Sequence, residues 1–255
     1  MKLLVVGAGS MGRWFADTVA ENVPGAVDVA FADADPTVAA AAAEALGGRQ
    51  VPLDDDERFD AVCVAVPISA VETSVATQAP RAQKALVDVS GVMAAPVEAM
   101  RRAAPDHERI SFHPLFAPAN APGTVASVVD AAGPATDRVR AALEEAGNTV
   151  FETTPEEHDR AMETVQASAH AAVLAFALAA RAVRPEFHTP VSAALTEAVG
   201  MVTGGTPRVY REIQETFEGA ERVAEAAARV AAADGDEFEA LYHEASVGDA
   251  SGGER

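Results

Sequence analysis

The sequence predicts an α/β protein in which a doubly wound parallel sheet is followed by an all-helical C-terminal domain. Three observations support this prediction. A glycine-rich turn, 7–12, follows an apolar run; short apolar runs alternate with helical stretches up to about residue 155; and long helical stretches without a convincing strand fill 156–247. Strands that alternate with helices are typical of parallel sheets with right-handed crossovers. We therefore expect a Rossmann-like domain over 1–155, a helical domain over 156–247 and a disordered tail over 248–255.

Seven apolar runs predict the strands of the sheet. Each run is short and rich in aliphatic side chains, and glycine or polar residues bound it. The strands are expected at residues 3–6, 27–32, 59–66, 85–89, 110–112, 125–130 and 148–152.

The longest helical stretches lie in the second half of the chain. The segment from Thr154 to Glu157 predicts a helix start, with Thr154 as cap and Pro155 at the first helical position. The apolar stretch 171–180 is too short to span a bilayer, so we expect a core helix there and no membrane association. The helices are expected at residues 11–22, 36–46, 156–183, 189–203, 207–232 and 235–245.

The charge of the chain limits its partners. The 255 residues carry a formal net charge of −20, and Lys2 and Lys84 are the only lysines. No basic stripe is present, so nucleic acid is not an expected partner. An acidic, lysine-poor composition favours a halophilic protein in a cytoplasm of high salt, where repulsion is screened; acidic drift in the genome is the alternative.

Cysteine use and the start of the chain indicate the compartment. A single cysteine, Cys63, excludes an internal disulfide framework and a cysteine-based metal site. It lies in an apolar run, so a small core residue is expected there. The apolar run that precedes Gly7 is too short for a signal peptide. We expect a cytoplasmic location and no metal.

The glycine turn has the spacing and context of a dinucleotide site. Gly7 permits a tight turn, Gly9 lets the backbone approach a pyrophosphate, and Gly12 allows a helix to pack closely on the strand. Ser10 and Met11 open the following helix, whose free N–H groups attract phosphate. We expect all five residues to bind the cofactor.

The residue that ends the second strand indicates which dinucleotide binds. Asp33 would accept hydrogen bonds from the adenosine ribose and repel a 2′-phosphate, and no arginine follows it in 34–37. This favours NAD over NADP. Val66 and Pro67 end another strand, where such a sheet meets its cofactor; a plain turn is the alternative.

His113 is the candidate catalytic residue. It follows a short predicted strand and precedes Pro114, which keeps the backbone extended. An imidazole at this place could accept the proton of a substrate hydroxyl while hydride leaves the same carbon. A structural histidine is the alternative reading.

These segments together resemble the prephenate/arogenate dehydrogenase family of tyrosine biosynthesis. The segment 113–118, HPLFAP, is similar to the family's HPMFGP, and Val66-Pro67-Ile68 matches its VPI. Glu157-His158-Asp159, followed by Met162, Gln166 and His170, resembles its EHD…M…Q…H helix. The resemblance covers roughly residues 1 to 215.

The resemblance implies an NAD-dependent oxidative decarboxylation of prephenate to 4-hydroxyphenylpyruvate. In this reading His113 accepts the proton of the C4 hydroxyl and the hydroxyl of Ser90 assists. His170 and Gln166 face the substrate from the helical domain, and Asp159 or His158 sets interdomain geometry. Arg208, Arg211 and Arg181 are the candidates for the substrate carboxylates, and none of them matches the family position. A homodimer is expected through the helical domain, whose Ala- and Val-rich helices present apolar faces.

Several positions depart from the family pattern. The family serine falls on Gly91, one residue after Ser90, and the family lysine falls on Met93. The arginine that binds a substrate carboxylate falls on Met201, which cannot do so. The glycine of HPMFGP and an upstream arginine are replaced by Ala117 and Ala193.

These departures leave three alternatives open. One is arogenate dehydrogenase, whose substrate tolerates a less cationic pocket. Another is a nucleotide-binding homologue with a different substrate or no activity. The third is a β-hydroxyacid dehydrogenase, a class that uses a catalytic lysine in the helical domain. It is disfavoured because both lysines of this chain lie in the nucleotide domain.

Overall fold

The computed structural model describes residues 1–247, which form two compact units. The first unit spans Met1–Ala161 and the second, the helical unit, begins at Met162. The sequence places this division after residue 155. Contacts place it six residues later because the first turns of the next helix pack on the first unit through His158 and Asp159. The predicted disordered tail, 248–255, lies outside the described residues.

The first unit is built on an eight-stranded sheet in the order β3-β2-β1-β4-β5-β6-β7-β8. The strands are β1 (Lys2–Val6), β2 (Asp28–Ala32), β3 (Arg49–Gln50), β4 (Phe59–Val64), β5 (Ala82–Val89), β6 (Glu108–Pro114), β7 (Thr124–Ala131) and β8 (Thr149–Glu152). The doubly wound sheet is confirmed with one correction. β7 runs antiparallel to β6, because the connection 115–123 holds only a 3₁₀ turn and is too short for a crossover.

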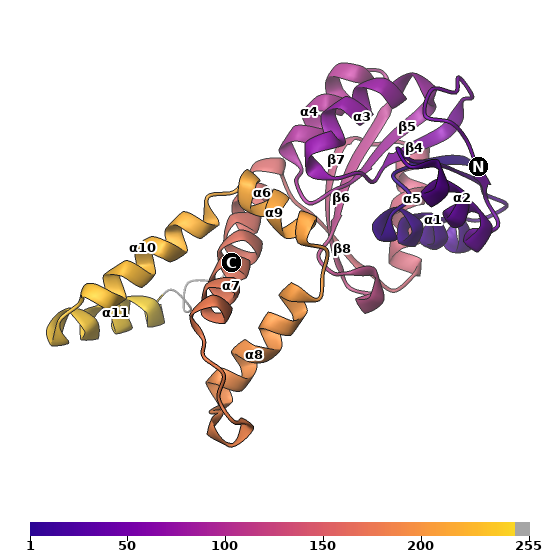
Figure 1. Cartoon of the computed structure of the whole chain (residues 1–255). Helices are drawn as coiled ribbons and strands as arrows, with labels where there is room; N and C mark the ends of the chain where they lie inside the picture. Colours follow the sequence, from indigo (N-terminus) through magenta and orange to yellow (C-terminus); the bar gives the residue numbers. More distant parts are fainter. Residues whose placement is uncertain (248–255) are drawn as a thin grey trace. The chain divides into compact units, whose positions relative to one another are not determined.

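Helices cover both faces of this sheet (Figure 1). On one face lie α1 (Ser10–Asn22), α2 (Pro36–Leu46) and α5 (Pro134–Glu145); on the other lie α3 (Val71–Gln78) and α4 (Ala94–Ala103). Successive residues of β1 enter the two cores in turn, Leu3 on the α1 side and Leu4 on the α3 side. Cys63 is buried, as expected for a small core residue. Short 3₁₀ turns occupy η1 (Ile68–Ala70), η2 (Ala79–Arg81) and η3 (Pro118–Asn120).

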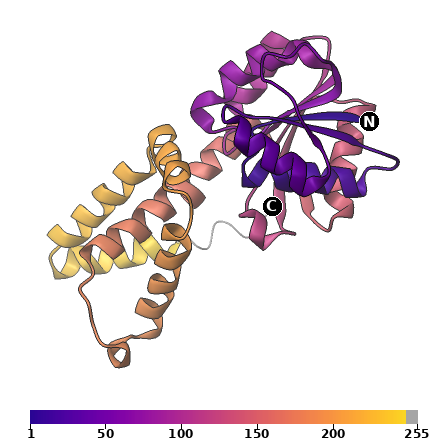
Figure 2. The same cartoon turned by 45° about the vertical axis from the view of Figure 1, so that its right-hand side comes forward.

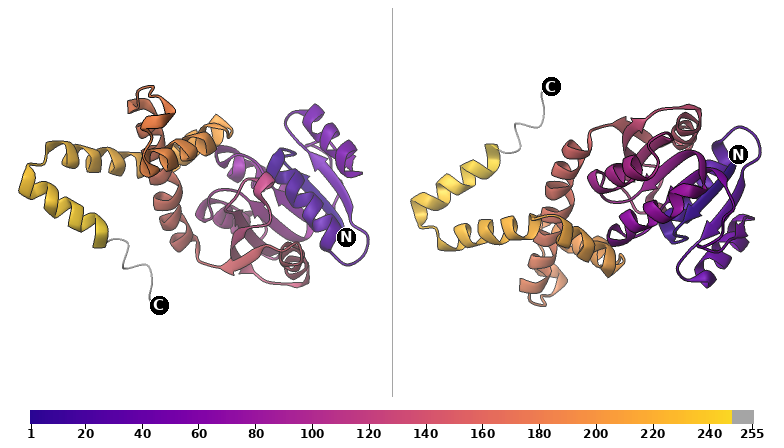
Figure 3. Two further views of the ribbon diagram at one scale, coloured as in Figure 1. Left: turned by 90° about the horizontal axis from the view of Figure 1, so that it is seen from below. Right: turned by 90° about the horizontal axis from the view of Figure 1, so that it is seen from above.

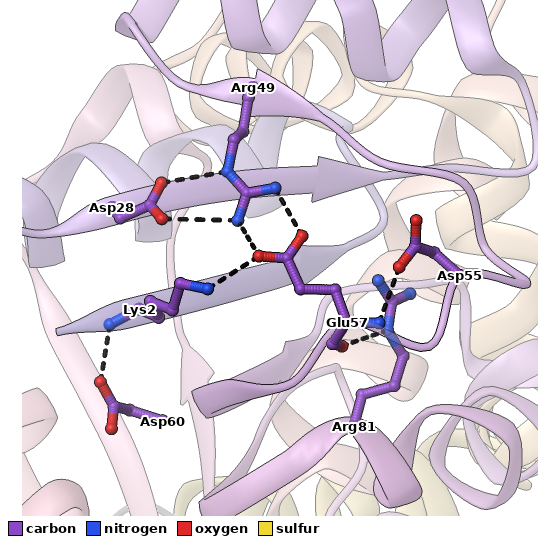
Figure 4. Close-up of polar contacts among 7 residues, drawn as sticks. All are labelled: Lys2, Asp28, Arg49, Asp55, Glu57, Asp60 and Arg81. Atoms are coloured by element: carbon purple, nitrogen blue, oxygen red, sulfur yellow. Dashed lines mark hydrogen bonds and ion pairs between the residues drawn. The ribbon is translucent and has the colours of Figure 1, made fainter.

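Charged side chains join the amino ends of the first strands (Figure 4). Arg49 Nε lies 3.2 Å from Asp28, and its Nη2 lies 2.6 Å from Glu57. Lys2 Nζ also reaches Glu57, at 2.8 Å. Hydrogen bonds from Arg49 and then Lys2 lower the pKa of Glu57 to about 2. Because the cluster is solvent-accessible it adds little stability, but it ties the two-residue strand β3 to its neighbours.

The second unit is helical, as predicted. It continues from α6 (Pro155–Met162), of which all but the last residue belongs to the first unit. Its elements are a π-helical turn, η4 (Glu163–Ser168), then α7 (Ala169–Ala179), the 3₁₀ turn η5 (Pro185–Phe187), α8 (Pro190–Thr203), α9 (Pro207–Thr216), α10 (Gly219–Ala232) and α11 (Gly235–Val247). The helix predicted over 156–183 is thus interrupted by the π turn and ends at Ala179. α8 and α10 both pack on α7 (Figure 2). α11 turns back from the end of α10, to which the Arg229–Glu244 ion pair joins it at 2.7 Å (Figure 3).

The predicted core helix, α7, is not buried in the single chain. None of its residues is buried, and Leu178 is 88% exposed. The reason is that few elements cover it, and the buried apolar side chains of this unit are Met162, Ala167, Val202 and Ile213 among the described residues. The continuous run Pro155–Ala179 is long and apolar enough to cross a membrane by length and composition, a test that core helices of soluble proteins also pass.

Candidate active site

The glycine turn adopts a conformation that side chains would block at two of its three glycines. Gly7 has a φ of +95°, and a Cβ there would overlap the carbonyl oxygen of Ala65. A Cβ on Gly12 would overlap the carbonyl oxygen of Gly7, so α1 packs directly on the turn. A Cβ on Gly9 would meet nothing within 4 Å. The turn therefore presents open space at the glycine where a pyrophosphate would approach.

The start of α1 is suited to an anion. Gly9 is its N-cap, and no side chain among the described residues caps its first turn. Ser10 is exposed and Met11 is half-buried at the first helical positions. Uncapped N–H groups and the helix dipole favour a phosphate at this end.

Asp33 joins the end of β2 to the glycine turn. Its Oδ2 accepts a hydrogen bond from the backbone N–H of Ala8 at 2.8 Å, and its Oδ1 accepts from that of Asp35 at 3.0 Å. Carboxylate oxygens can accept further bonds, so a ribose hydroxyl could still bind. The glycine turn, the uncapped helix and this carboxylate together fit a dinucleotide.

The segment after β4 links the glycine turn to the histidine. Val66 Cγ1 lies 3.1 Å from the position of a Cβ on Gly7, whereas Pro67 is exposed at the start of η1. Ile68 Cδ1 lies 3.6 Å from the position of a Cβ on Gly91. The structure thus brings Val66 against the cofactor turn and Ile68 against the predicted catalytic region.

His113 lies within β6 and not just beyond it, paired in register with Ala126. The side chain is buried, and its Nδ1 lies 2.9 Å from Nε2 of His158. Burial, followed by the influence of His158, lowers the pKa of His113 to about 3. The imidazole is therefore uncharged at neutral pH, which leaves one ring nitrogen as an acceptor.

The geometry does not support the predicted role of Ser90. Its hydroxyl is buried and bonds to Asp88 Oδ2 at 2.9 Å and to the carbonyl oxygen of Val92 at 3.0 Å. Gly91, the next residue, faces the histidine instead: a Cβ there would lie 3.8 Å from His113 Nε2. Ser90 and Gly91 lie in a bend after β5, where the Ser90 hydroxyl is already bonded to Asp88 and Val92, so a one-residue shift does not carry it to the place that Gly91 occupies.

Asp88 fixes the turn that carries Gly91. It is fully buried at the end of β5 and accepts hydrogen bonds from Ser90 at 2.9 Å and Ser111 at 2.8 Å. Burial raises its pKa to about 7, although these hydrogen bonds act in the opposite direction. A carboxyl group in this environment is held partly protonated near neutral pH.

The helical unit contains the other predicted site residues. Gln166 lies in the π turn, a feature that is frequent at functional sites. The ring of His170 packs edge-on against Tyr210 with centroids 4.8 Å apart, and burial lowers the pKa of His170. Arg208 Nε pairs with the buried Glu212 at 2.9 Å. A substrate carboxylate would compete with Glu212 for this arginine.

Sequence reasoning underestimated two residues of the first unit. His158 and Asp159 were expected to set interdomain geometry, and the structure places them on His113 and on the start of α4. The sequence marks both residues by their place after a capped helix start and by their match to the family's EHD motif, but neither signal reveals the contact with His113.

Comparisons with known proteins agree with this arrangement. The family model "Prephenate dehydrogenase, nucleotide-binding domain" matches residues 20–131. A 4-amino-4-deoxyprephenate dehydrogenase of Streptomyces pristinaespiralis is 30% identical over 276 residues, covering 95% of this chain and 88% of that protein. A probable arogenate/prephenate dehydrogenase of Methanocaldococcus jannaschii is 25% identical over 178 residues, covering 64% of this chain and 40% of that protein.

Solved structures show the same fold. The chain superimposes on prephenate dehydrogenase of Aquifex aeolicus, in complex with hydroxyphenyl propionate and NAD+, with a TM-score of 0.69 and 17% identity, covering 98% of this chain and 92% of that one. Arogenate dehydrogenase of Synechocystis gives a TM-score of 0.64 and 15% identity, covering 98% of this chain and 99% of that one.

Replacing Asp88 should change how stability depends on pH. Because the folded state holds a proton on Asp88 that the unfolded state has lost, this group stabilises the protein fully below about pH 4, and that contribution is lost as the pH rises towards about 7. The free energy of unfolding in urea should therefore fall less between pH 5 and pH 8 in Asp88→Asn than in the wild type. The exposed Asp106→Asn is the control, and parallel curves for wild type and Asp88→Asn would contradict the assignment.

Proposed function

Because the chain belongs to the prephenate dehydrogenase family, we propose that it is an NAD-dependent enzyme that oxidises and decarboxylates prephenate. The observation that carries the proposal is His113, an uncharged and buried base in the same unit as a turn that fits a dinucleotide. The enzyme is proposed to work in the cytoplasm, in agreement with its single, buried cysteine.

The cofactor would be held by the glycine turn and its neighbours. Backbone amides around Gly9, Ser10 and Met11 bind the pyrophosphate, and Asp33 binds the ribose. Val66 and Pro67 border the same place. NAD supplies the hydride acceptor when it is bound.

His113 handles the proton of the reaction. As hydride leaves C4 of prephenate, His113 Nε2 accepts the proton of the C4 hydroxyl. The ring carboxylate departs as carbon dioxide, and the electrons of its bond complete the aromatic ring. The proton then returns to the ring oxygen, so no proton is gained or lost overall.

A second candidate substrate is favoured by one specific observation, the glycine beside His113. A hydroxyl at C4 donates to a base and also accepts a bond from a donor, and Gly91 supplies no side-chain donor. An amino group at C4 becomes an iminium as hydride leaves, which carries only N–H donors and needs only an acceptor. The site therefore suits 4-amino-4-deoxyprephenate, the substrate named for the Streptomyces relative.

The helical unit is proposed to hold the rest of the substrate. His170, Gln166 and Arg208 remain the substrate-binding candidates, and Met201 offers no positive charge. Arg208 would have to exchange Glu212 for a substrate carboxylate. An amino group in the side chain, as in arogenate, would reduce the positive charge that this part of the site must supply.

The helical unit is also proposed to form a homodimer. Its exposed apolar side chains include Leu178, Val183, Phe187, Val191, Met201 and Tyr242, each more than half exposed. A second copy of the chain would cover such faces and give α7 the burial that its sequence predicts.

Replacing His113 should remove turnover and spare cofactor binding. In His113→Asn, kcat for NADH formation with prephenate should fall about 10²- to 10⁴-fold, because the proton acceptor is lost. The Kd for NAD, measured by calorimetry, should stay within about twofold, since the glycine turn is unchanged. The exposed His243→Asn serves as control, and near-normal turnover in His113→Asn would remove His113 from the mechanism.

Replacing Asp33 should weaken NAD and relax the preference over NADP. The Kd for NAD should rise about 10- to 100-fold in Asp33→Ala, as expected for a charged hydrogen-bond acceptor. Asp35→Ala is the matched control, because Asp35 caps α2 through Thr37 instead. An unchanged ratio of NAD to NADP affinity would count against the ribose contact.

Adding a hydroxyl at position 91 should shift the substrate preference. In Gly91→Ser the ratio of kcat/KM for prephenate to that for 4-amino-4-deoxyprephenate should rise about 10-fold, the equivalent of one hydrogen bond of about 1.4 kcal/mol. Gly91→Ala adds the same Cβ without the hydroxyl, in ordinary contact with Ile68 and His113, and should not shift the ratio. Equal ratios in both variants would reject position 91 as a specificity determinant.

Light scattering in molar salt should give the mass of a dimer. High salt is chosen because the net charge of −20 opposes association at low salt. Leu178→Glu should shift the mass towards the monomer without unfolding the chain, because Leu178 is 88% exposed in the single chain. A monomeric wild type would overturn the proposal.

A further inference from the structure

His113 begins a hydrogen-bonded chain that ends on the backbone of α4. Its Nδ1 lies 2.9 Å from Nε2 of His158, whose Nδ1 lies 2.8 Å from Oδ1 of Asp159. Asp159 accepts hydrogen bonds from the backbone N–H groups of Met93 at 2.9 Å and Ala94 at 3.1 Å. All of these residues belong to the first unit, and the two imidazoles are 8% and 3% exposed.

The carboxylate of Asp159 decides which atom donates in each of these hydrogen bonds. An ionised carboxylate can only accept, so Nδ1 of His158 carries the proton of that bond. A neutral imidazole has one N–H, which leaves Nε2 of His158 as an acceptor. The bond between the rings must then be donated by Nδ1 of His113. His113 Nε2, the nitrogen nearest Gly91, is consequently unprotonated.

We propose that His158 and Asp159 are positioning residues that fix the tautomer of His113, so that its Nε2 is the proton acceptor of the reaction. The inference rests on the function proposed above for His113. Neither residue is required to touch the substrate, because both act through the imidazole.

Asp159 is anchored in a way that keeps it ionised. Burial acts to raise its pKa, but hydrogen bonds from His158 and from the amides of Met93 and Ala94 outweigh burial and lower the pKa. The same two amides open α4, which has no side-chain cap from its own N-cap residue, Met93. Asp159 therefore caps α4 and orients His158 at once, and it ties the turn that carries Gly91 to the histidine pair.

The arrangement also accommodates the transferred proton. As the O–H bond of the C4 hydroxyl breaks, an N–H bond forms at His113 Nε2. The positive charge is shared with His158 through the bond between the rings and is offset by Asp159. When the ring becomes aromatic, the proton returns from Nε2 to the oxygen of the product. His158 and Asp159 both act electrostatically on His113, His158 lowering its pKa and Asp159 raising it.

Reversing the direction of the hydrogen bonds between His113, His158 and Asp159 should inactivate the enzyme while leaving its fold and its cofactor site intact. The side-chain amide introduced by Asp159→Asn can donate to Nδ1 of His158, which turns both rings to the opposite tautomer and places a proton on His113 Nε2. We expect kcat to fall about 10²-fold or more, with KM and the Kd for NAD nearly unchanged. His158→Gln can donate to Asp159 and accept from His113, so it should retain more activity than His158→Phe over the whole pH profile. Glu157→Gln removes a neighbouring exposed charge and should behave as the wild type.

Nitrogen-15 NMR of histidine-labelled protein tests the tautomer without any substrate. The Nε2 resonance of His113, assigned from its loss in His113→Asn, should have the shift of an unprotonated nitrogen in the wild type and of a protonated one in Asp159→Asn. A protonated Nε2 in the wild type would overturn the inference. So would kcat values of Asp159→Asn and His158→Phe within twofold of the wild type. If the wild type turns over no substrate, the proposed function fails, whereas the NMR result still decides the tautomer.

Discussion

The burial of His113 is the constraint on which the rest of the site depends. A buried imidazole is held uncharged, and its polar nitrogens require hydrogen-bond partners inside the protein. That requirement draws the first turns of α6 onto the first unit through His158. The burial of His113 thus explains why the first unit extends to Ala161, beyond the last strand of the sheet.

Two carboxyl groups whose pKa values are shifted in opposite directions hold the turn after β5. Asp88, buried and with a raised pKa, accepts hydrogen bonds from Ser90 at the start of the turn and from Ser111 on β6. Asp159, with a lowered pKa, binds the amides at its end. Between them Gly91 is kept beside His113. Gly91 is therefore held in a fixed position. A small side chain added there should change the preference between a C4 hydroxyl and a C4 amino group without unfolding the protein.

The sequence predicted those features that local patterns encode. Alternating strands and helices, the glycine turn and the all-helical second half are all readable from periodicity and spacing, and the structure agrees with them. The strand at β7 was predicted, but its antiparallel direction was not, because connection length and not strand composition sets that direction. Ser90 was chosen over Gly91 because a hydroxyl is visible in the sequence and the direction of a side chain is not. The bond between His113 and His158 joins residues 45 positions apart, so no local pattern could reveal it. The burial expected for α7 was not found, because an apolar composition does not reveal how many elements pack on a helix.

An enzyme that transfers hydride to NAD and releases carbon dioxide from one substrate in the same turnover must form both products in equal amounts. The test is the joint yield of NADH and labelled carbon dioxide from ring-carboxyl-labelled prephenate and its 4-amino analogue, with purified protein in molar salt. We expect equal yields of the two products from at least one of these substrates. NADH without carbon dioxide, or neither product despite measurable binding of NAD, would contradict the proposed function.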